Sequence, residues 1–265
     1  MMQSLFTAAT GMSAQQLNID TISNNLANVS TTGFKAQRVD FQDLMYINLK
    51  PPGTPTSPET NTPAGLQIGE GVQPIATQRI FTVGPVENTN NPLDIMIQGP
   101  ESFFQVTLPN GETAYTRDGS FTQDANGNIV TANGYFLDPP IQLPADTSAI
   151  QITSTGQILV QTASTSTQTQ VGQLELTRFV NPTGLDAIGN NLYLATAASG
   201  EPIQGTPGST GFSNVQQGSL EQSNVDVTTE MVNLIVAQRA YELNSKTVST
   251  ADTMLYDVST MKQFP

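Results

Sequence analysis

The stretch that decides the fold is VDVTTEMVNLIVAQRAYELNSKTVSTADTMLYDVSTMK, residues 225–262. Apolar side chains recur there every seven positions, at Val227, Leu234, Tyr241, Val248 and Leu255, and Met231, Ala237, Ala251 and Val258 lie beside them at spacings of three or four. Because no Pro or Gly occurs between Asp226 and Lys262, the pattern predicts one unbroken helix, about 55 Å long at about 1.5 Å per residue. A helix of that length needs a partner along its apolar seam.

The first residues of the chain carry a matching pattern. Leu5, Met12, Ile19 and Leu26 repeat at intervals of seven, Ser4 can cap the start of a helix, and Gly33 can end it. The two runs predict an inner domain of residues 1–33 and 222–265, in which the N- and C-terminal helices pair as in a coiled coil. The alternative is two ordinary amphipathic helices docked on a globular body.

The side chains of the N-terminal run are small and polar. Ala, Gln and Asn are frequent there, at Ala8, Ala9, Ala14, Gln15, Gln16, Asn18, Asn24, Asn25 and Asn28. Such a seam is too thin to hold well in isolation, but it allows close packing against several neighbours at once.

Charge and composition exclude several classes of function. The chain has nine Lys and Arg against 22 Asp and Glu, a formal net charge of −13, and the excess negative charge lies in the middle of the sequence. An acidic surface repels phosphate and anionic lipid, so we expect binding neither to nucleic acid nor to a membrane surface. No stretch approaches the ~20 apolar residues of a membrane span, so we expect no membrane insertion. The N-terminal residues lack the charge and apolar pattern of a secretory signal peptide, so export would keep the N-terminus.

A connector of residues 34–75 follows the first helical run. Its residues 46–63 are rich in Pro, which removes backbone hydrogen-bond donors and leaves little to bury. This segment is predicted to be a linker or a protruding loop. It could be disordered; the alternative is a semi-rigid arm that becomes ordered against a neighbouring subunit.

Residues 76–221 carry the signals of an antiparallel β domain. Alternating apolar residues flank Asn110-Gly111, and Asn126-Gly127 and Asn133-Gly134 give the same hairpin signal. The Ser/Thr/Gln tract at residues 161–170 is predicted to be an exposed loop or a hairpin tip. The fold class is therefore α+β, with helical ends and a central antiparallel β domain.

Few residues could carry catalysis. The chain has no His and no Cys, which removes the usual general base, thiol chemistry and imidazole or thiolate metal sites. The remaining candidate is a carboxylate pair, Asp118 and Asp124, both next to turn residues. We therefore predict no catalytic residues, no cofactor and no metal; the remote alternative is a secreted, carbohydrate-active β protein.

Motifs at both ends resemble one protein family. Residues 23–29, SNNLANV, with 32–35, TGFK, are similar to the N-terminal signature of the bacterial flagellar rod and hook proteins. Residues 230–235, EMVNLI, with 238–242, QRAYE, and 244–246, NSK, are similar to their C-terminal signature. Residues 116–121, TRDGSF, and 91–94, NPLD, resemble motifs of the family's β domain. The chain's length and the text at 65–72, GLQIGEGV, point to the distal rod within that family.

The resemblance implies a structural subunit rather than an enzyme. Family members are exported unfolded through the flagellar type III apparatus and polymerise into a helical tube, with the terminal helices inside and the β domain outside. The expected protein is a distal rod subunit in the basal body, spanning the periplasm, which forms a rigid tube that transmits torque to the hook. The alternative within the family is a proximal rod or hook subunit.

The implied partners are copies of the chain itself, other rod proteins, hook subunits, the surrounding P- and L-ring proteins and the export apparatus. The expected assembly interface is Leu5, Met12, Ile19, Asn24, Asn25, Leu26, Asn28, Leu234, Gln238, Tyr241, Asn244, Val248 and Leu255. The insert of residues 46–63 is expected to stiffen the tube by wedging between neighbours, through Tyr46, Pro51, Pro52, Pro55, Pro58 and Pro63.

Overall fold

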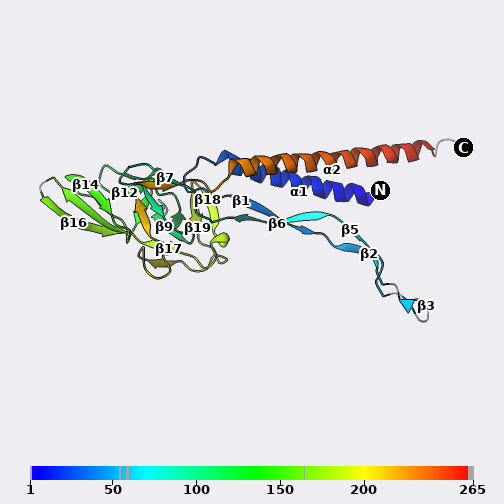
Figure 1. Ribbon diagram of the computed structural model, residues 1–265, viewed down its shortest axis with the longest axis horizontal. Helices are drawn as coiled ribbons and strands as arrows, with labels where there is room; N and C mark the ends of the chain where they lie inside the picture. The colour runs from blue at the N-terminus through cyan, green and yellow to red at the C-terminus, as the bar shows by residue number, and fades with distance from the viewer. Residues whose placement is uncertain (1, 54, 58–59, 62, 164, 262–265) are drawn as a thin grey trace. The chain divides into compact units, whose positions relative to one another are not determined.

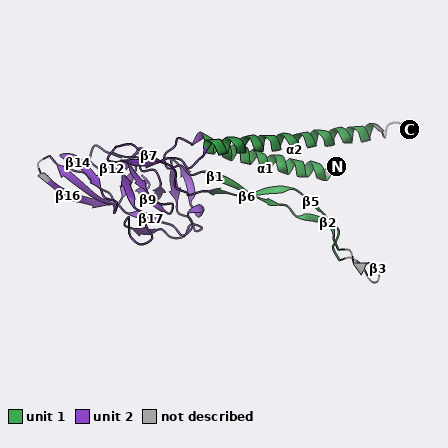
Figure 2. Cartoon of the chain, viewed as in Figure 1, with its two compact units in different colours: residues 1–26, 37–78, 227–265 green, residues 27–36, 79–226 purple. Residues whose placement is uncertain are grey.

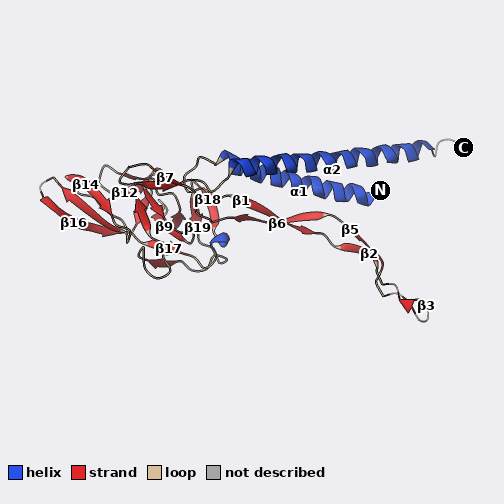
Figure 3. Ribbon diagram, viewed as in Figure 1, coloured by secondary structure: helices blue, strands red, loops and turns tan. Residues whose placement is uncertain are grey.

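The computed structural model describes residues 2–53, 55–57, 60, 61, 63–163 and 165–261 (Figure 1). The chain divides into two compact units, coloured separately in Figure 2. Unit 1 contains residues 1–26, 37–78 and 227–265, and unit 2 contains residues 27–36 and 79–226. Unit 1 holds the long helices and unit 2 is built mainly of strands (Figure 3), which confirms the predicted α+β class.

The first helix, α1 (Met2–Ala27), ends earlier than predicted, at Ala27 and not at Gly33. The chain turns after Ala27 because Asn28 holds Thr31: the Thr31 N–H donates to the Asn28 carbonyl oxygen at 3.1 Å and the Thr31 hydroxyl to Asn28 Oδ1 at 3.2 Å. Short polar side chains favour such turns over a continued helix. Gly33 lies in a later turn with φ +66°.

The second helix, α2 (Val227–Met261), has 35 residues and confirms the long unbroken helix. Glu230 lies in its first turn, where a negative charge is favourable. The predicted end at Lys262 lies outside the described residues. Across the described part of the chain, neither helix is apolar enough over a sufficient length to cross a membrane.

The connector is made of strand pairs, whereas the sequence favoured a linker or loop for residues 46–63. In unit 1, β1 (Gln37–Asp43) pairs with β6 (Val72–Arg79), and β2 (Tyr46–Lys50) pairs antiparallel with β5 (Leu66–Gly69). Beyond them β3 (Pro55–Ser57) pairs with β4 (Thr60–Asn61). The apolar residues of these strands lie on either side of the Pro-rich part. The Pro content therefore favoured a loop for the whole segment, and the strands were not predicted. We call residues 44–71 the arm.

Unit 2 is organised around a nine-stranded sheet whose strands pair antiparallel. Its strands are β9 (Ser102–Thr107), β10 (Thr113–Thr116), β11 (Phe121–Gln123), β12 (Ile129–Thr131), β13 (Phe136–Asp138), β17 (Leu176–Arg178), β18 (Asp186–Gly189), β19 (Leu192–Leu194) and β20 (Ile203–Gly205). The main path is β11-β12-β13-β9-β10-β19-β18, and β17 pairs with both β9 and β20. The three predicted Asn-Gly reversals are confirmed, joining β9 to β10, β11 to β12 and β12 to β13.

Smaller sheets complete unit 2. A three-stranded sheet contains β14 (Thr147–Ile152), β15 (Gln157–Thr162) and β16 (Thr165–Gln173), so most of the Ser/Thr/Gln tract is a hairpin strand; residue 164 lies outside the described residues. β7 (Val86–Asn88) pairs with β22 (Ser219–Glu221), and β8 (Ile95–Ile97) with β21 (Val215–Gln217). A 3-10 turn, η1 (Pro182–Gly184), precedes β18.

The core of unit 2 lies on both sides of β9. Successive residues of a strand point to opposite faces, and Phe103 and Phe104 therefore enter different clusters. Phe104 meets Phe121 edge to face at 5.1 Å between ring centroids, whereas Phe103 meets Phe179 at 5.8 Å. Both rings are fully buried.

Candidate assembly surfaces

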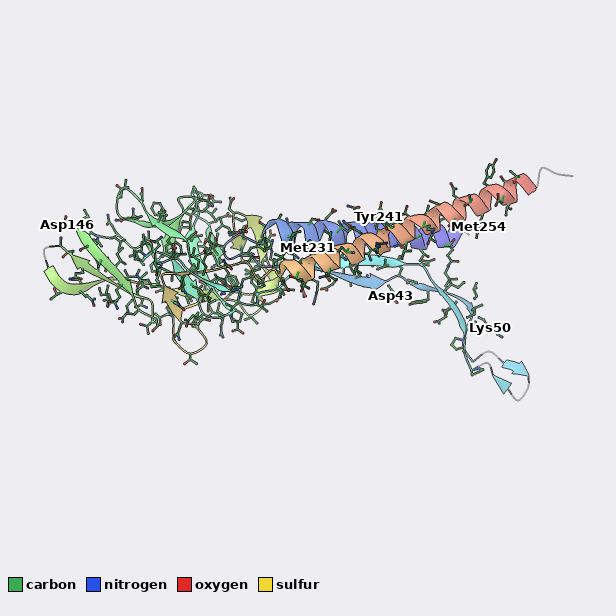
Figure 4. All side chains as sticks on the ribbon, turned by 45° about the horizontal axis from the view of Figure 1, so that its top comes forward. Asp43, Lys50, Asp146, Met231, Tyr241 and Met254 are labelled. Carbon is green, nitrogen blue, oxygen red and sulfur yellow. The ribbon has the colours of Figure 1, made fainter. Side chains whose placement is uncertain are left out.

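The two helices of unit 1 lie side by side in Figures 1 and 4, and contacts join them at two levels. Asn25 Nδ2 donates to Glu230 Oε1 at 3.3 Å. Gly11 lies against Asn244, because a Cβ on Gly11 would stand 2.8 Å from Asn244 Nδ2. A small residue on α1 thus accommodates a polar side chain of α2.

Asn25 also fixes the end of α1 to the start of β1. Its Nδ2 donates to the Gln37 carbonyl oxygen and its Oδ1 accepts from the Gln37 N–H, both at 2.8 Å. The Asn25 side-chain amide thus pairs with the Gln37 backbone as a strand residue would. Because both of its polar atoms are hydrogen-bonded, the side chain can be buried here.

The predicted interface residues occupy different environments. Asn25 is buried, and Asn24, Gln238 and Tyr241 are exposed. The others are partly buried: Leu5, Met12, Ile19, Leu26, Asn28, Leu234, Asn244, Val248 and Leu255. The buried contributions from the helices are mostly small, at Ala8, Ala14, Ile22, Ala237 and Ala251.

The seam between the helices is hollow toward the start of α1. One hollow of about 420 Å³ is lined by Ser4 of α1 and by residues of α2 that include Leu243 and Met254. Another, of about 530 Å³, lies among Thr7, Asn244 and Ile68 and their neighbours. Side chains of one chain therefore do not fill this part of unit 1.

The long helix exposes apolar side chains both on its heptad seam and away from it. Figure 4 labels Met231, Tyr241 and Met254 along it. The apolar repeat predicted Val227 and Tyr241 in the seam and Met231 and Val258 beside it, and it did not single out the others; the exposed set is Val227, Met231, Val232, Ile235, Val236, Tyr241, Leu243, Met254, Tyr256 and Val258. Exposed apolar groups in such number mark a surface that contacts other proteins.

The arm has one apolar side and one polar side. Ile47 and Ile68 are register partners and so project from the same face, and the exposed Leu49 lies at the irregularity in register between Asn48 and Lys50. Asn48 and Gln67 are the partners on the other face. Every residue of β2 is exposed, and an isolated two-stranded hairpin is only marginally stable in water.

The Pro residues that were expected to stiffen the tube follow Lys50 in the sequence of the arm; Figure 4 labels Lys50. Pro51, Pro52 and Pro63 are exposed, and Pro55 begins β3. Pro58 lies outside the described residues. Tyr46, at the start of β2, is exposed.

An apolar hollow lies where the arm meets α1. It measures about 490 Å³ and is lined by Gln3, Phe6, Thr10, Leu44, Ile47 and Glu70. Phe6 is 70% exposed although it is a large aromatic residue. Gly71 lets this contact form, because a Cβ there would strike the Thr10 hydroxyl.

Unit 2 contains a buried ion cluster that the sequence reading missed. Lys35 Nζ lies 2.6 Å from Glu221 Oε1, and Arg117 Nη2 lies 2.8 Å from Glu221 Oε2. The exposed fractions of Lys35, Arg117 and Glu221 are 0%, 2% and 3%. Two cations therefore share one carboxylate out of contact with water.

Backbone carbonyls complete the cluster. Lys35 Nζ donates to the Thr82 carbonyl oxygen at 2.7 Å, and Arg117 Nη1 donates to the carbonyl oxygens of Gly99 at 2.6 Å and Ser102 at 2.5 Å. Burial, and next the charge of Arg117, lower the pKa of Lys35 to about 8, and Glu221 opposes this shift. The only signal in the sequence was that Lys35 and Arg117, two of nine basic residues, belong to family motifs.

The two candidate catalytic carboxylates have structural contacts. Asp118 Oδ1 accepts from the Thr32 hydroxyl at 3.1 Å and from the Ser120 N–H at 3.0 Å. Asp124 accepts from the Ala125 N–H and from Asn126 Nδ2 within its turn. Within the described ranges, no group of three or more acidic residues is arranged to hold a metal ion.

Comparisons with known proteins match the chain along most of its length. Residues 5–35 match the flagella basal body rod protein family, residues 96–160 the flagellar hook protein FlgE/F/G D1 domain, and residues 216–261 the flagellar basal body rod FlgEFG protein C-terminal family.

Whole proteins match as well. The flagellar basal-body rod protein FlgG of Borreliella burgdorferi is 48% identical over 99% of this chain and 100% of its own length. FlgG of Buchnera aphidicola from Acyrthosiphon pisum is 49% identical, covering 98% and 99%, and FlgG of Caulobacter vibrioides is 46% identical, covering 98% and 100%. The chain therefore belongs to the FlgG family of flagellar basal-body rod proteins, and it is a structural subunit of the flagellar rod, not an enzyme.

Proposed function

We propose that this chain is the distal rod subunit, which polymerises into a rigid helical tube that carries motor torque to the hook. The observation that carries the proposal is the unfilled surface of unit 1: hollows at the helix seam together with exposed apolar side chains along α2. Head-to-tail contacts that do not close into a ring generate such a tube.

In this proposal the terminal helices form the inner layer of the tube. They pair as in a coiled coil and also contact the helices of neighbouring copies, through the partly buried seam of Leu5, Met12, Leu234 and Val248. Asn24, Gln238 and Asn244 supply polar contacts between subunits. The helices are expected to fold fully only on assembly, because their seam is thin and partly hollow within one chain.

The other partners follow from this location. The ends of the polymer meet other rod proteins and hook subunits, and its outer surface faces the P- and L-ring proteins across the periplasm. The chain reaches that location through the flagellar type III apparatus. The carbohydrate-active alternative is set aside, because the family consists of structural rod and hook proteins.

The arm is proposed to stiffen the tube by laying its apolar face on a neighbouring copy. Ile47 and Ile68 on one face, and Leu49 near them, are exposed in the single chain, and Ile47 also lines the hollow beside Phe6. Burying these side chains against a neighbour would remove them from water, at about 25 cal/mol per Å² of apolar surface.

Excision of the arm tests this role. Tyr46 and Gly69 are register partners and the Leu44 N–H donates to the Gly71 carbonyl oxygen at 2.8 Å, so an Asn-Gly turn can replace residues 46–69. The shortened chain is expected to polymerise into tubes that bend more, seen by electron microscopy as a shorter persistence length. Ile47→Ser with Ile68→Ser should reproduce much of this loss.

The matched control is Asn48→Ser with Gln67→Ser, on the opposite face of the same strands. It should leave tubes as straight as those of the unaltered chain. Straight tubes after excision would refute the stiffening role, and curved tubes from the unaltered chain would favour the hook assignment.

A further inference from the structure

The chain passes between unit 1 and unit 2 at four points, after residues 26, 36, 78 and 226. On the unit 2 side these points belong to three segments, residues 27–36, 79–85 and 221–226. All three meet around the buried carboxylate of Glu221 and the amide of Asn224. We call residues 33–36, 80–85 and 221–225 the collar.

Glu221 binds both other segments of the collar. Its backbone carbonyl oxygen accepts from the Gly33 N–H at 2.8 Å, and its Oε1 accepts from Lys35 Nζ at 2.6 Å. The same Oε1 accepts from the Gly84 N–H at 3.0 Å, while Oε2 is held by Arg117 of the large sheet.

Asn224, three residues after Glu221, also binds both other segments of the collar. Its Oδ1 accepts from the Ala36 N–H at 2.7 Å. Its Nδ2 donates to the Ile80 carbonyl oxygen at 2.8 Å and to the Thr82 hydroxyl at 2.9 Å. The Ile80 N–H in turn donates to the Ala36 carbonyl oxygen at 2.9 Å, so each pair of segments is joined directly.

Close backbone packing and an apolar patch support these bonds. A Cβ on Gly84 would strike the Gln222 carbonyl oxygen, and one on Gly33 would stand 2.8 Å from the Asp118 nitrogen. Phe34, Ala36 and Val225 form a small buried cluster of their own. The segments fit only with glycine at these two positions.

We propose that the collar is one cooperative element, through which force passes between the terminal helices and the β unit of each subunit. Its role in carrying load rests on the proposed rod function. The physical basis is that three segments share two polar hubs, so detaching any one segment breaks hydrogen bonds that Glu221 or Asn224 makes to it.

Hydrogen exchange on the full-length monomer, followed peptide by peptide, tests the cooperativity. Glu221→Gln should accelerate exchange at residues 33–36, 80–85 and 222–225 together, by about tenfold or more, because two buried cations lose their counter-charge. Exchange in β14 to β16, which contain neither collar residues nor the partners of Arg117, should not change. If this variant does not fold, Asn224→Ala carries the same test, since it removes bonds to residues 36, 80 and 82.

The matched control is Asp94→Asn. Asp94 is also a buried carboxylate of unit 2, and it accepts from Thr89 and Asn91 in its own loop. Its replacement should affect residues 89–94 and leave the collar unchanged. Faster exchange confined to the altered segment, or an equal change in β15, would overturn the proposal. Because the monomer is measured, either result leaves the rod assignment to be judged by polymer formation.

Discussion

Lys35 is a residue whose pKa is set mainly by burial and next by the charge of Arg117. It shares the Glu221 carboxylate with Arg117, and its pKa falls to about 8 from the ordinary 10.5. Between these two values the folded chain has released a proton that the unfolded chain still holds. The free energy of unfolding therefore rises with pH across this window, and the gain is lost as pH falls through 8.

Lys35→Met removes this titration. We expect the stability of the unaltered chain, relative to the variant, to increase between pH 8 and pH 10 by up to about 1.4 kcal/mol per pH unit. Urea denaturation at half-unit pH intervals measures the difference. Tyr193 lies near the cluster with a raised pKa, mainly because of its burial, but it is present in both chains and cancels.

Lys50→Met is the control, since Lys50 is exposed on the arm. Its difference curve should be flat over the same range. Parallel curves for Lys35→Met and the unaltered chain would show that the buried cation does not titrate near pH 8.

At the scale of elements, the helix pair depends on a small residue facing a polar one. A Cβ on Gly11 would lie 2.8 Å from Asn244 Nδ2, so Gly11→Ala should weaken the pairing although Ala favours a helix by about 0.5–1 kcal/mol. Adding Asn244→Ala removes the close contact. The higher helix propensity of Ala at position 11 should then make the helix pair more stable.

A double-mutant cycle of these two substitutions measures the effect. The thermal stability of each polymer is followed by the loss of its helical circular dichroism signal on heating. The expected coupling energy is about 1 kcal/mol, within the range for residues in contact. Additive effects of the two substitutions would mean that Gly11 and Asn244 do not share a contact.

The success of prediction also differs among elements. The span of α2 and the Asn-Gly hairpins were predicted because their signals are local: a seven-residue apolar repeat without Pro or Gly, and turn residues that tolerate positive φ. The strands β2 and β5 were missed because each is short and its partner lies beyond the Pro-rich tip. The early end of α1 depends on Asn28, whose turn competes with helix.

At the scale of the whole molecule, assembly and folding of the β unit should be separable. Leu234→Asp or Val248→Asp places a charge in the partly buried seam of unit 1, where burying it costs free energy. Either variant is expected to abolish polymer formation, measured by sedimentation. Near-ultraviolet circular dichroism from the buried aromatic clusters of unit 2 should be unchanged.

Ser249→Asp is the comparison, because Ser249 neighbours Val248 but is exposed. It should assemble nearly as the unaltered chain does. Polymer formation by both seam variants would exclude the heptad seam as the assembly interface.

The sequence by itself determined the helical ends, the antiparallel β middle and, through its motifs, the rod family, since these rest on periodicity, turn chemistry and local residue patterns. Only the tertiary structure decided that Lys35, Arg117 and Glu221 meet, that Asn224 joins residues 36 and 80, and that the arm is a two-faced hairpin. The physical reason is distance along the chain. A buried charge becomes stable only when partners more than a hundred residues away complete its hydrogen bonds, and no local pattern records that requirement.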